Sequence, residues 1–202
     1  MTPLPPLIEL RNISYSSPGQ SSPLLEGVNF ILREERLGLI GPNGSGKTTL
    51  LGLLGGVQRV QRGSIELLGE DLGKLSAGAR DRFRVDHTGY IFQQFNLLPF
   101  LSVRENVELP CRFSRLRSQR AAQRHGSVDG AAAALLDHLG LNAELLERRA
   151  GELSIGQQPR VPAARAVIGQ PDPVLADAPT SAPHLDHREA FPPPPVAACR
   201  PR

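Results

Sequence analysis

The chain has 202 residues, 40% of them hydrophobic, which is enough for a single domain with a substantial core. Its net charge of +3 is mild, and 4% aromatic residues leave no interleaving of basic and aromatic side chains, so we expect no nucleic-acid partner. No apolar stretch approaches the ~20 residues that cross a bilayer, and no signal peptide is recognisable. Cys111 and Cys199 match no metal spacing, which favours a reducing, cytoplasmic compartment.

The first predicted elements are strands. Residues 7–15 and 28–33 show alternating apolar patterning around a Ser-Ser-Pro-Gly-Gln turn. Residues 37–40, Leu-Gly-Leu-Ile, predict a short apolar strand, and residues 50–54 predict an apolar helix. A glycine-rich segment lies directly between that strand and that helix. The order of strand, loop and helix is the one that a phosphate-binding loop requires.

That segment, residues 41–49, reads Gly-Pro-Asn-Gly-Ser-Gly-Lys-Thr-Thr. Its glycines allow the backbone to curl so that successive N–H groups point at phosphate oxygens, and the following helix directs its positive dipole end at the same anion. Lys47 would reach the terminal phosphates, and the Thr48 hydroxyl would bind Mg²⁺. The candidate nucleotide-binding residues here are Gly41, Pro42, Asn43, Gly44, Ser45, Gly46, Lys47, Thr48 and Thr49.

More α/β structure is predicted after the loop and its helix. Residues 64–68 and 88–92 are predicted strands, and residues 76–84 a short helix between them. These elements indicate an α/β core with a parallel component.

A helical insert is expected over residues 96–150. Ser102 to Glu105 form a capping box, and the alanine-rich residues 131–136 lead toward Gly140 as a helix stop. The insert also carries a basic run, which we expect to be a solvated helix face, with contact to anionic lipid headgroups or a partner as the alternative. This run comprises Arg112, Arg115, Arg117, Arg120 and Arg124.

Prolines are frequent in the C-terminal part of the sequence. Pro159 and Pro162 fall in the helix expected after residue 157, and a proline in a helix interior costs about 3 kcal/mol. Residues 183–202 include four consecutive prolines, so we expect a disordered tail. That tail implies no ordered scaffold, so we expect no metal site from its neighbouring ligand types, His184, Asp186 and His187.

Several segments resemble the motifs of ABC-type ATPases. Residues 153–157, Leu-Ser-Ile-Gly-Gln, are similar to the family signature, usually Leu-Ser-Gly-Gly-Gln, and residues 41–49 are similar to Walker A. Residues 89–99 resemble the Q-loop, and residues 174–177, Val-Leu-Ala-Asp, resemble Walker B. These motifs follow the family order within residues 7–182. The residues of the Q-loop segment resemble those of the subgroup that serves lipoprotein release and macrolide export.

The resemblance implies a P-loop NTPase fold, with a RecA-like α/β core, an antiparallel β subdomain and an inserted α-helical subdomain. The core would comprise residues 1–95 and 151–182, and the helical subdomain residues 96–150, in a single domain. The family's later core strands and its switch histidine have no counterpart here. We therefore expect the C-terminal strands of the core to be missing, through truncation or a frame alteration.

The resemblance also implies ATP and Mg²⁺ as ligands. Gln93 would bind Mg²⁺ and sense the γ-phosphate, and Asp177 would hold Mg²⁺ through water, beside Thr48. Tyr15 would stack on adenine, with packing in the core as the alternative. The signature residues would act on the ATP of a partner subunit, and they are Ser154, Gly156 and Gln157.

The implied assembly is a homodimer, or a pair with an equivalent ATPase subunit, that sandwiches ATP and drives a separate integral-membrane permease. The helical insert and Gln93 would contact that permease. The chain would then be cytoplasmic and peripheral at the inner face of the cell membrane. The reaction of the family is the hydrolysis of ATP to ADP and phosphate.

The sequence departs from the family pattern where the hydrolytic groups should be. Ala178 stands at the position of the glutamate that polarises the attacking water, and alanine cannot accept a proton. Ile155 replaces a signature glycine, and residues 181–186 disturb the D-loop. We therefore expect an ABC transporter subunit that binds ATP but hydrolyses it weakly. The alternatives are a non-catalytic regulatory subunit or an unstable truncated product and, more remotely, a phosphate-loop kinase or GTPase.

Overall fold

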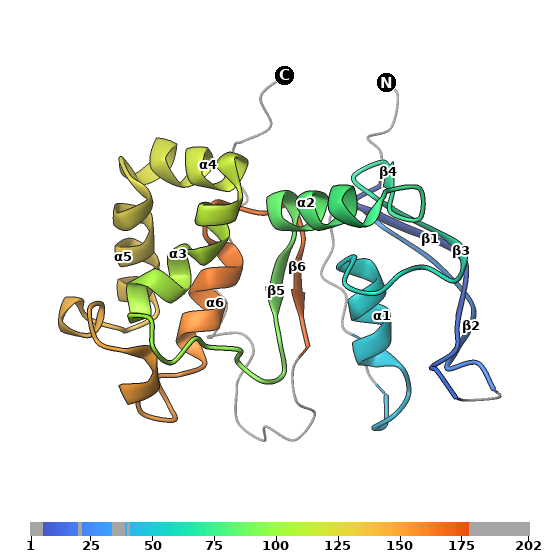
Figure 1. Cartoon of the computed structure of the whole chain (residues 1–202), viewed down its shortest axis with the longest axis horizontal. Helices are drawn as coiled ribbons and strands as arrows, with labels where there is room; N and C mark the ends of the chain where they lie inside the picture. The colour runs from blue at the N-terminus through green and yellow to red at the C-terminus, as the bar shows by residue number, and fades with distance from the viewer. Residues whose placement is uncertain (1–5, 20–21, 34–38, 40, 178–202) are drawn as a thin grey trace.

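The computed structural model describes residues 6–19, 22–33, 39 and 41–177. Its N-terminal part is a four-stranded antiparallel sheet in the order β2-β1-β3-β4 (Figure 1). The strands are β1 (Ile8–Tyr15), β2 (Leu25–Leu32), β3 (Arg62–Leu67) and β4 (Glu70–Asp71). The predicted strands over 7–15, 28–33 and 64–68 are confirmed, whereas the short β4 was not predicted.

A bulge in β1 decides which of its side chains enter the core. Ile8 and Leu10 are buried, and Asn12 then adopts a positive φ of 52° where the pairing with β2 shifts register. Because the extra residue reverses the alternation, the next buried side chain is Ile13 rather than an even-numbered residue.

A second, parallel pair of strands lies at the centre of the molecule, β5 (Gly89–Ile91) and β6 (Val174–Ala176). Helix α1 (Lys47–Leu54) packs between this pair and the antiparallel sheet, and α2 (Ala77–His87) follows β4. The predicted parallel component is therefore confirmed. The predicted strand over 37–40 lies outside the described residues except for Leu39, which is in no strand.

Helices form the remaining part, as predicted. They are α3 (Val103–Phe113), α4 (Arg115–His125), α5 (Val128–His138) and α6 (Arg160–Val167), with 3-10 turns at Ala143–Leu145 and Ala150–Glu152. The predicted capping box is present, because the Ser102 side chain accepts from the Glu105 N–H and the Glu105 carboxylate accepts from the Ser102 N–H. None of the helices in the described ranges is long and apolar enough to cross a membrane.

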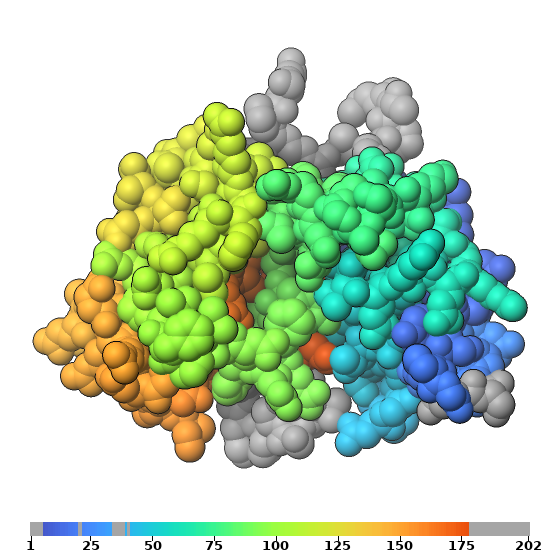
Figure 2. All heavy atoms as spheres, in the orientation of Figure 1, coloured from blue at the N-terminus to red at the C-terminus, as the bar shows by residue number. Residues whose placement is uncertain are grey.

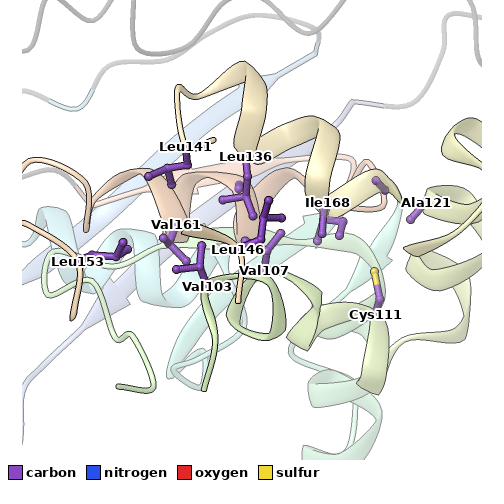
Figure 3. Close-up of a cluster of buried hydrophobic side chains, with 13 residues drawn as sticks. Val103, Val107, Cys111, Ala121, Leu136, Leu141, Leu146, Leu153, Val161 and Ile168 are labelled. Carbon is purple, nitrogen blue, oxygen red and sulfur yellow. The ribbon is translucent and has the colours of Figure 1, made fainter. Parts of the chain in front are cut away.

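Each part has its own apolar cluster. One lies between the antiparallel sheet and α1, and Leu175 of β6 joins it. The other joins α3, α5 and the C-terminal end of α6, where Val107, Leu136 and the C-cap residue Ile168 lie close to one another in Figure 3. Figure 2 shows the resulting surface, in which α2 and β5 bridge the helical part and the sheet part.

A single buried amide shapes the loop that leads into α3. The Asn106 side chain accepts a hydrogen bond from the Leu98 N–H at 2.9 Å and donates to the carbonyls of Leu98 and Ser102, each at 3.0 Å. Asn106 is fully buried. Its amide therefore replaces the backbone partners that this irregular segment lacks.

The arginine run is only partly a solvated face, so that expectation was wrong for Arg117. This side chain is 2% exposed and donates to the carbonyls of Arg165, Ala166 and Ile168 at the end of α6, at 2.6 to 3.2 Å. A further bond, of 3.4 Å, reaches a fourth carbonyl, that of Thr88 before β5. Burial lowers the pKa of Arg117 to about 10, which leaves it charged at neutral pH.

The position of Pro162 also differs from the expectation. The helix after residue 157 begins only at Arg160, with Pro159 as its N-cap, so Pro162 is the third helical residue. The N–H groups of the first helical turn have no partner within the helix, so a proline there removes no hydrogen bond. The expected cost of a proline in a helix interior therefore does not arise.

We predict that Arg117→Met lowers the free energy of unfolding by about 3 kcal/mol or more, because several buried carbonyls lose their donor. Arg124→Met is the matched control on an exposed position of the same helix and should change stability by less than about 0.5 kcal/mol. Urea unfolding followed by circular dichroism measures both. Equal effects in the two variants would contradict the assigned role of Arg117.

We further predict that Pro162→Ala changes the unfolding free energy by less than about 1 kcal/mol. Ala164→Pro in the same helix should cost about 3 kcal/mol or more, because residue 164 lies one turn inside the helix and its N–H bonds the backbone there. Thermal unfolding of the two variants tests this, and strong stabilisation by Pro162→Ala would show that Pro162 is strained.

Candidate functional site

The phosphate-binding loop precedes α1 and depends on its glycines. Gly44 and Gly46 have positive φ angles of 80° and 88°. A Cβ atom on Gly46 would also lie 2.8 Å from the Leu25 side chain of β2, so the antiparallel sheet packs closely against the start of α1. Only glycine combines this backbone conformation with this close approach.

The start of α1 offers its backbone donors to an anion. No side chain caps the helix, and its first turn contains no acidic residue. The Lys47 ammonium donates to the carbonyls of Gly41 at 2.7 Å and Pro42 at 2.8 Å, so it is held over the loop. The loop is largely exposed, as is the Thr48 side chain. Uncapped N–H groups at a helix start, the helix dipole and one ammonium at the same place are the chemistry of a phosphate site.

The two parallel strands bring Gln93 and Asp177 to one edge. Asp177 follows β6 directly, is 9% exposed, and donates its N–H to the Ile91 carbonyl at 2.9 Å. Gln93 is exposed and lies two residues beyond the end of β5. Burial and then the charge of Asp177 raise the pKa of Tyr90 to about 12, so this phenol next to the site stays neutral.

Tyr15 lies at the end of β1, where its carbonyl accepts from the Leu24 N–H at 2.8 Å. Its half-buried ring packs against the cluster around α1 and also lines a surface depression of about 570 Å³ with residues 58–61. The ring thus has contacts both with the core and with a hollow on the surface. Core packing and stacking on a base are not exclusive at this position.

The signature segment forms a tight exposed turn before α6. The Ser154 carbonyl accepts from the N–H groups of Gln157 at 2.9 Å and Gln158 at 3.0 Å, while the Gln157 side chain accepts from the Ser154 N–H at 3.1 Å. Gly156 is exposed, and a side chain there would meet open space. The Gln157 side chain therefore serves the turn itself, and Ser154 and Gly156 face outward from it.

These segments share one edge of the molecule. In Figure 1 the start of α1, the ends of β5 and β6 and the start of α6 all lie along the lower edge. Within a single chain the signature turn belongs to the helical part, whereas the phosphate-binding loop belongs to the sheet part.

The residues proposed for Mg²⁺ supply the oxygen atoms that this ion prefers, from Thr48, Gln93 and Asp177. No group of three or more His, Cys, Asp or Glu side chains that could hold a metal occurs in the described ranges. Mg²⁺ beside nucleotides takes few protein ligands and completes its shell with phosphate and water, so this donor set fits that ion.

One residue that supports the candidate site, Arg165, belongs to no motif that the sequence analysis recognised. Arg165 of α6 donates to the carbonyls of Phe95 and Asn96, each at 2.8 Å, and so fixes the segment that follows Gln93. Burial lowers the pKa of Arg165. Its partners lie about seventy residues away in sequence, so no local pattern could identify it. Ala178 and residues 181–186 lie outside the described residues.

Comparison with known proteins agrees with this geometry. The family described as ABC transporter matches residues 25–181. The lipoprotein-releasing system ATP-binding protein LolD of Novosphingobium aromaticivorans is 40% identical over 188 residues, which cover 92% of this chain and 80% of that protein. The macrolide export ATP-binding/permease protein MacB of Shigella flexneri is 37% identical over 88% of this chain and 26% of its own length.

Two further similarities concern length and assembly. The uncharacterized ABC transporter ATP-binding protein YbbA of Escherichia coli is 42% identical over 78% of this chain, and the match spans 66% of YbbA. The dimeric post-hydrolysis structure of the ATP-binding cassette MJ0796 with ADP and Pi is 32% identical, with a TM-score of 0.77 over 91% of this chain and 78% of that one.

The similar MJ0796 cassette is a dimer with ADP and Pi bound, and MacB combines an ATP-binding part with a permease. The P-loop NTPase fold is confirmed by the similar cassette structures, and the subgroup that includes LolD and MacB is confirmed by the relatives. The chain therefore belongs to the ABC transporter family and is one of its ATP-binding cassettes.

Proposed function

We propose that this chain binds MgATP as the nucleotide-binding subunit of an ABC transporter and that it hydrolyses the bound ATP only weakly. The observation that carries the first part is the uncapped start of α1 with Lys47 held over the loop carbonyls. Phosphate oxygens would replace those carbonyls as acceptors, and charge-assisted bonds to phosphate are stronger than bonds to a neutral carbonyl.

The remaining residues have defined parts in this proposal. Thr48, Gln93 and Asp177 would hold Mg²⁺, which supplies positive charge to the terminal phosphates when bound. Tyr15 would stack on the adenine from the depression that it lines. Residues 1–95 and 151–182 would form the nucleotide-binding core, and residues 96–150 the helical subdomain.

The proposed assembly pairs two cassettes and one membrane permease. Each nucleotide would be closed in by Ser154, Gly156 and Gln157 of the opposite subunit. The dimeric MJ0796 cassette supports such pairing, because its fold is shared with this chain. LolD and MacB support a place with lipoprotein-releasing or macrolide-export systems, and the cassette would lie at the cytoplasmic face of the membrane.

Weak hydrolysis follows from Ala178. In the family pattern this position carries the carboxylate that orients and deprotonates the attacking water, and a methyl group does neither. Loss of a general base commonly costs ~10² to 10⁴ in rate. Ala178 also favours the second candidate, a regulatory cassette that binds ATP without turnover.

We predict that Lys47→Ala weakens MgATP binding about tenfold or more, because one charge-assisted contact to the phosphates is lost. Lys74→Ala is the matched control, since it removes the other lysine of the chain, which is exposed and pairs with Asp71. Isothermal titration calorimetry measures both affinities. Unchanged binding by Lys47→Ala would contradict the proposed phosphate site.

We also predict that Ala178→Glu raises the ATPase rate of the purified chain by about 10²-fold or more, because it restores a proton acceptor. Ala178→Gln is the control of similar size that cannot accept the proton and should stay slow. Phosphate release gives the rates. A wild-type turnover near 10 s⁻¹, typical of enzymes, would refute the proposed impairment.

A further inference from the structure

Gln93 stands in a short span between two fixed points of the backbone. Before it, the Ile91 carbonyl accepts from the Asp177 N–H at 2.9 Å, at the end of the β5–β6 pair. After it, the Phe95 carbonyl accepts from the Arg165 guanidinium at 2.8 Å. Residues 92–94 alone separate these two points, so the placement of both restricts where the Gln93 backbone can lie.

The Gln93 side chain depends on that backbone for its direction. It is exposed, and within the described ranges no hydrogen bond to another group holds it. In the proposed function this side chain holds Mg²⁺. A ligand that nothing else orients binds a metal tightly only if the main chain brings it to the right place, so the groups that fix this main chain matter for the metal.

Arg165 is well suited to fix the second of the two points. Its guanidinium donates to two consecutive carbonyls, those of Phe95 and Asn96, each at 2.8 Å. Because the donor is charged, these bonds are stronger than bonds between neutral groups. Asn96 has a positive φ of 45° and lies in no helix or strand, so the carbonyls here have no regular backbone partners.

Helix α6 gives Arg165 a rigid base. Its neighbours Ala164 and Ala166 are buried, and Arg117 donates to the Arg165 carbonyl at 3.2 Å. The helix therefore holds the guanidinium at a constant place behind the segment that it binds.

We propose that Arg165 is a positioning residue that directs Gln93 toward the Mg²⁺ of bound MgATP and so sets how much the ion adds to nucleotide affinity. This inference rests on the proposed function, because it requires the phosphate site at Lys47 and the Mg²⁺ ligand at Gln93. Arg165 contacts neither ion nor nucleotide in this role, and acts only through the backbone. Loss of a residue that orients a metal ligand typically costs about 10- to 100-fold in metal affinity.

The affinity of the full chain for ATP, measured by isothermal titration calorimetry in excess EDTA and in saturating Mg²⁺, tests the proposal. The ratio of the two dissociation constants is the Mg²⁺ enhancement. We expect Arg165→Met to lower this enhancement about tenfold. The affinity in EDTA should not change, because the phosphate-binding loop is untouched. A variant that is only less stable would bind with a smaller active fraction but with an unchanged ratio.

Arg160→Met is the matched control. Arg160 is another arginine of α6 whose guanidinium donates to two main-chain carbonyls, those of Leu139 at 3.2 Å and Gly140 at 3.0 Å. These carbonyls lie at the end of α5, far along the chain from Gln93. The control should therefore keep the full enhancement, whereas Arg165→Lys, which retains a charged donor, should keep part of it.

Asn96→Val disturbs the same fixed point without changing α6. A β-branched residue is strained at the positive φ of Asn96, and the Asn96 side chain is exposed, so the core is not affected. We expect a smaller loss of the Mg²⁺ enhancement in the same direction. This variant keeps the test decisive if Arg165→Met does not fold.

Combination with Gln93→Ala separates the inference from the proposed function. Because Arg165 acts through Gln93, Arg165→Met should lower the enhancement no further in the Gln93→Ala chain. A wild-type chain that binds no MgATP, or one in which Gln93→Ala keeps the whole enhancement, refutes the proposed function. If Gln93→Ala lowers the enhancement but Arg165→Met does not, or lowers it equally with and without Gln93, the inference alone is overturned.

Discussion

The insertion of Arg117 of α4 into the C-terminal end of α6 is the contact on which the packing of the helical part depends. Carbonyls at the C-terminus of a helix have no partner within it and carry partial negative charge. Arg117 supplies both the donors and the positive charge, from a position that is almost fully buried. Gly169 permits this approach, because a side chain there would lie 2.5 Å from the Arg117 carbonyl.

Once its end is fixed in this way, α6 relates several distant segments to one another. Its first residue follows the signature turn, and its C-terminal end leads into β6 and Asp177. From the last turn of the helix, Arg165 donates to the carbonyls of Phe95 and Asn96, which follow Gln93. A single short helix therefore connects the turn proposed to face a partner with two of the three groups proposed to hold Mg²⁺, Gln93 and Asp177.

Binding and hydrolysis make different demands on the chain, and the proposed function separates them. Holding phosphate relies on backbone N–H groups and on Lys47, which the loop geometry supplies before any ligand arrives. Breaking the bond to the terminal phosphate requires one correctly placed proton acceptor, and Ala178 provides none. Under that proposal an alanine at position 178 would leave the phosphate site intact, because the proposed site consists of main-chain N–H groups and Lys47.

The sequence by itself determined the ligand class, the family and most strands and helices, because the phosphate loop, the capping box and the alternating strands are local patterns. It could not determine that Pro162 lies in a first turn, since the late start of α6 depends on the hydrogen bonds of the signature turn. Nor could it identify Arg117 as a buried donor or Arg165 as a half-buried one. Both look like surface arginines in the sequence, and only the tertiary structure brings distant carbonyls to them, since an unpaired buried carbonyl is costly wherever the chain places it.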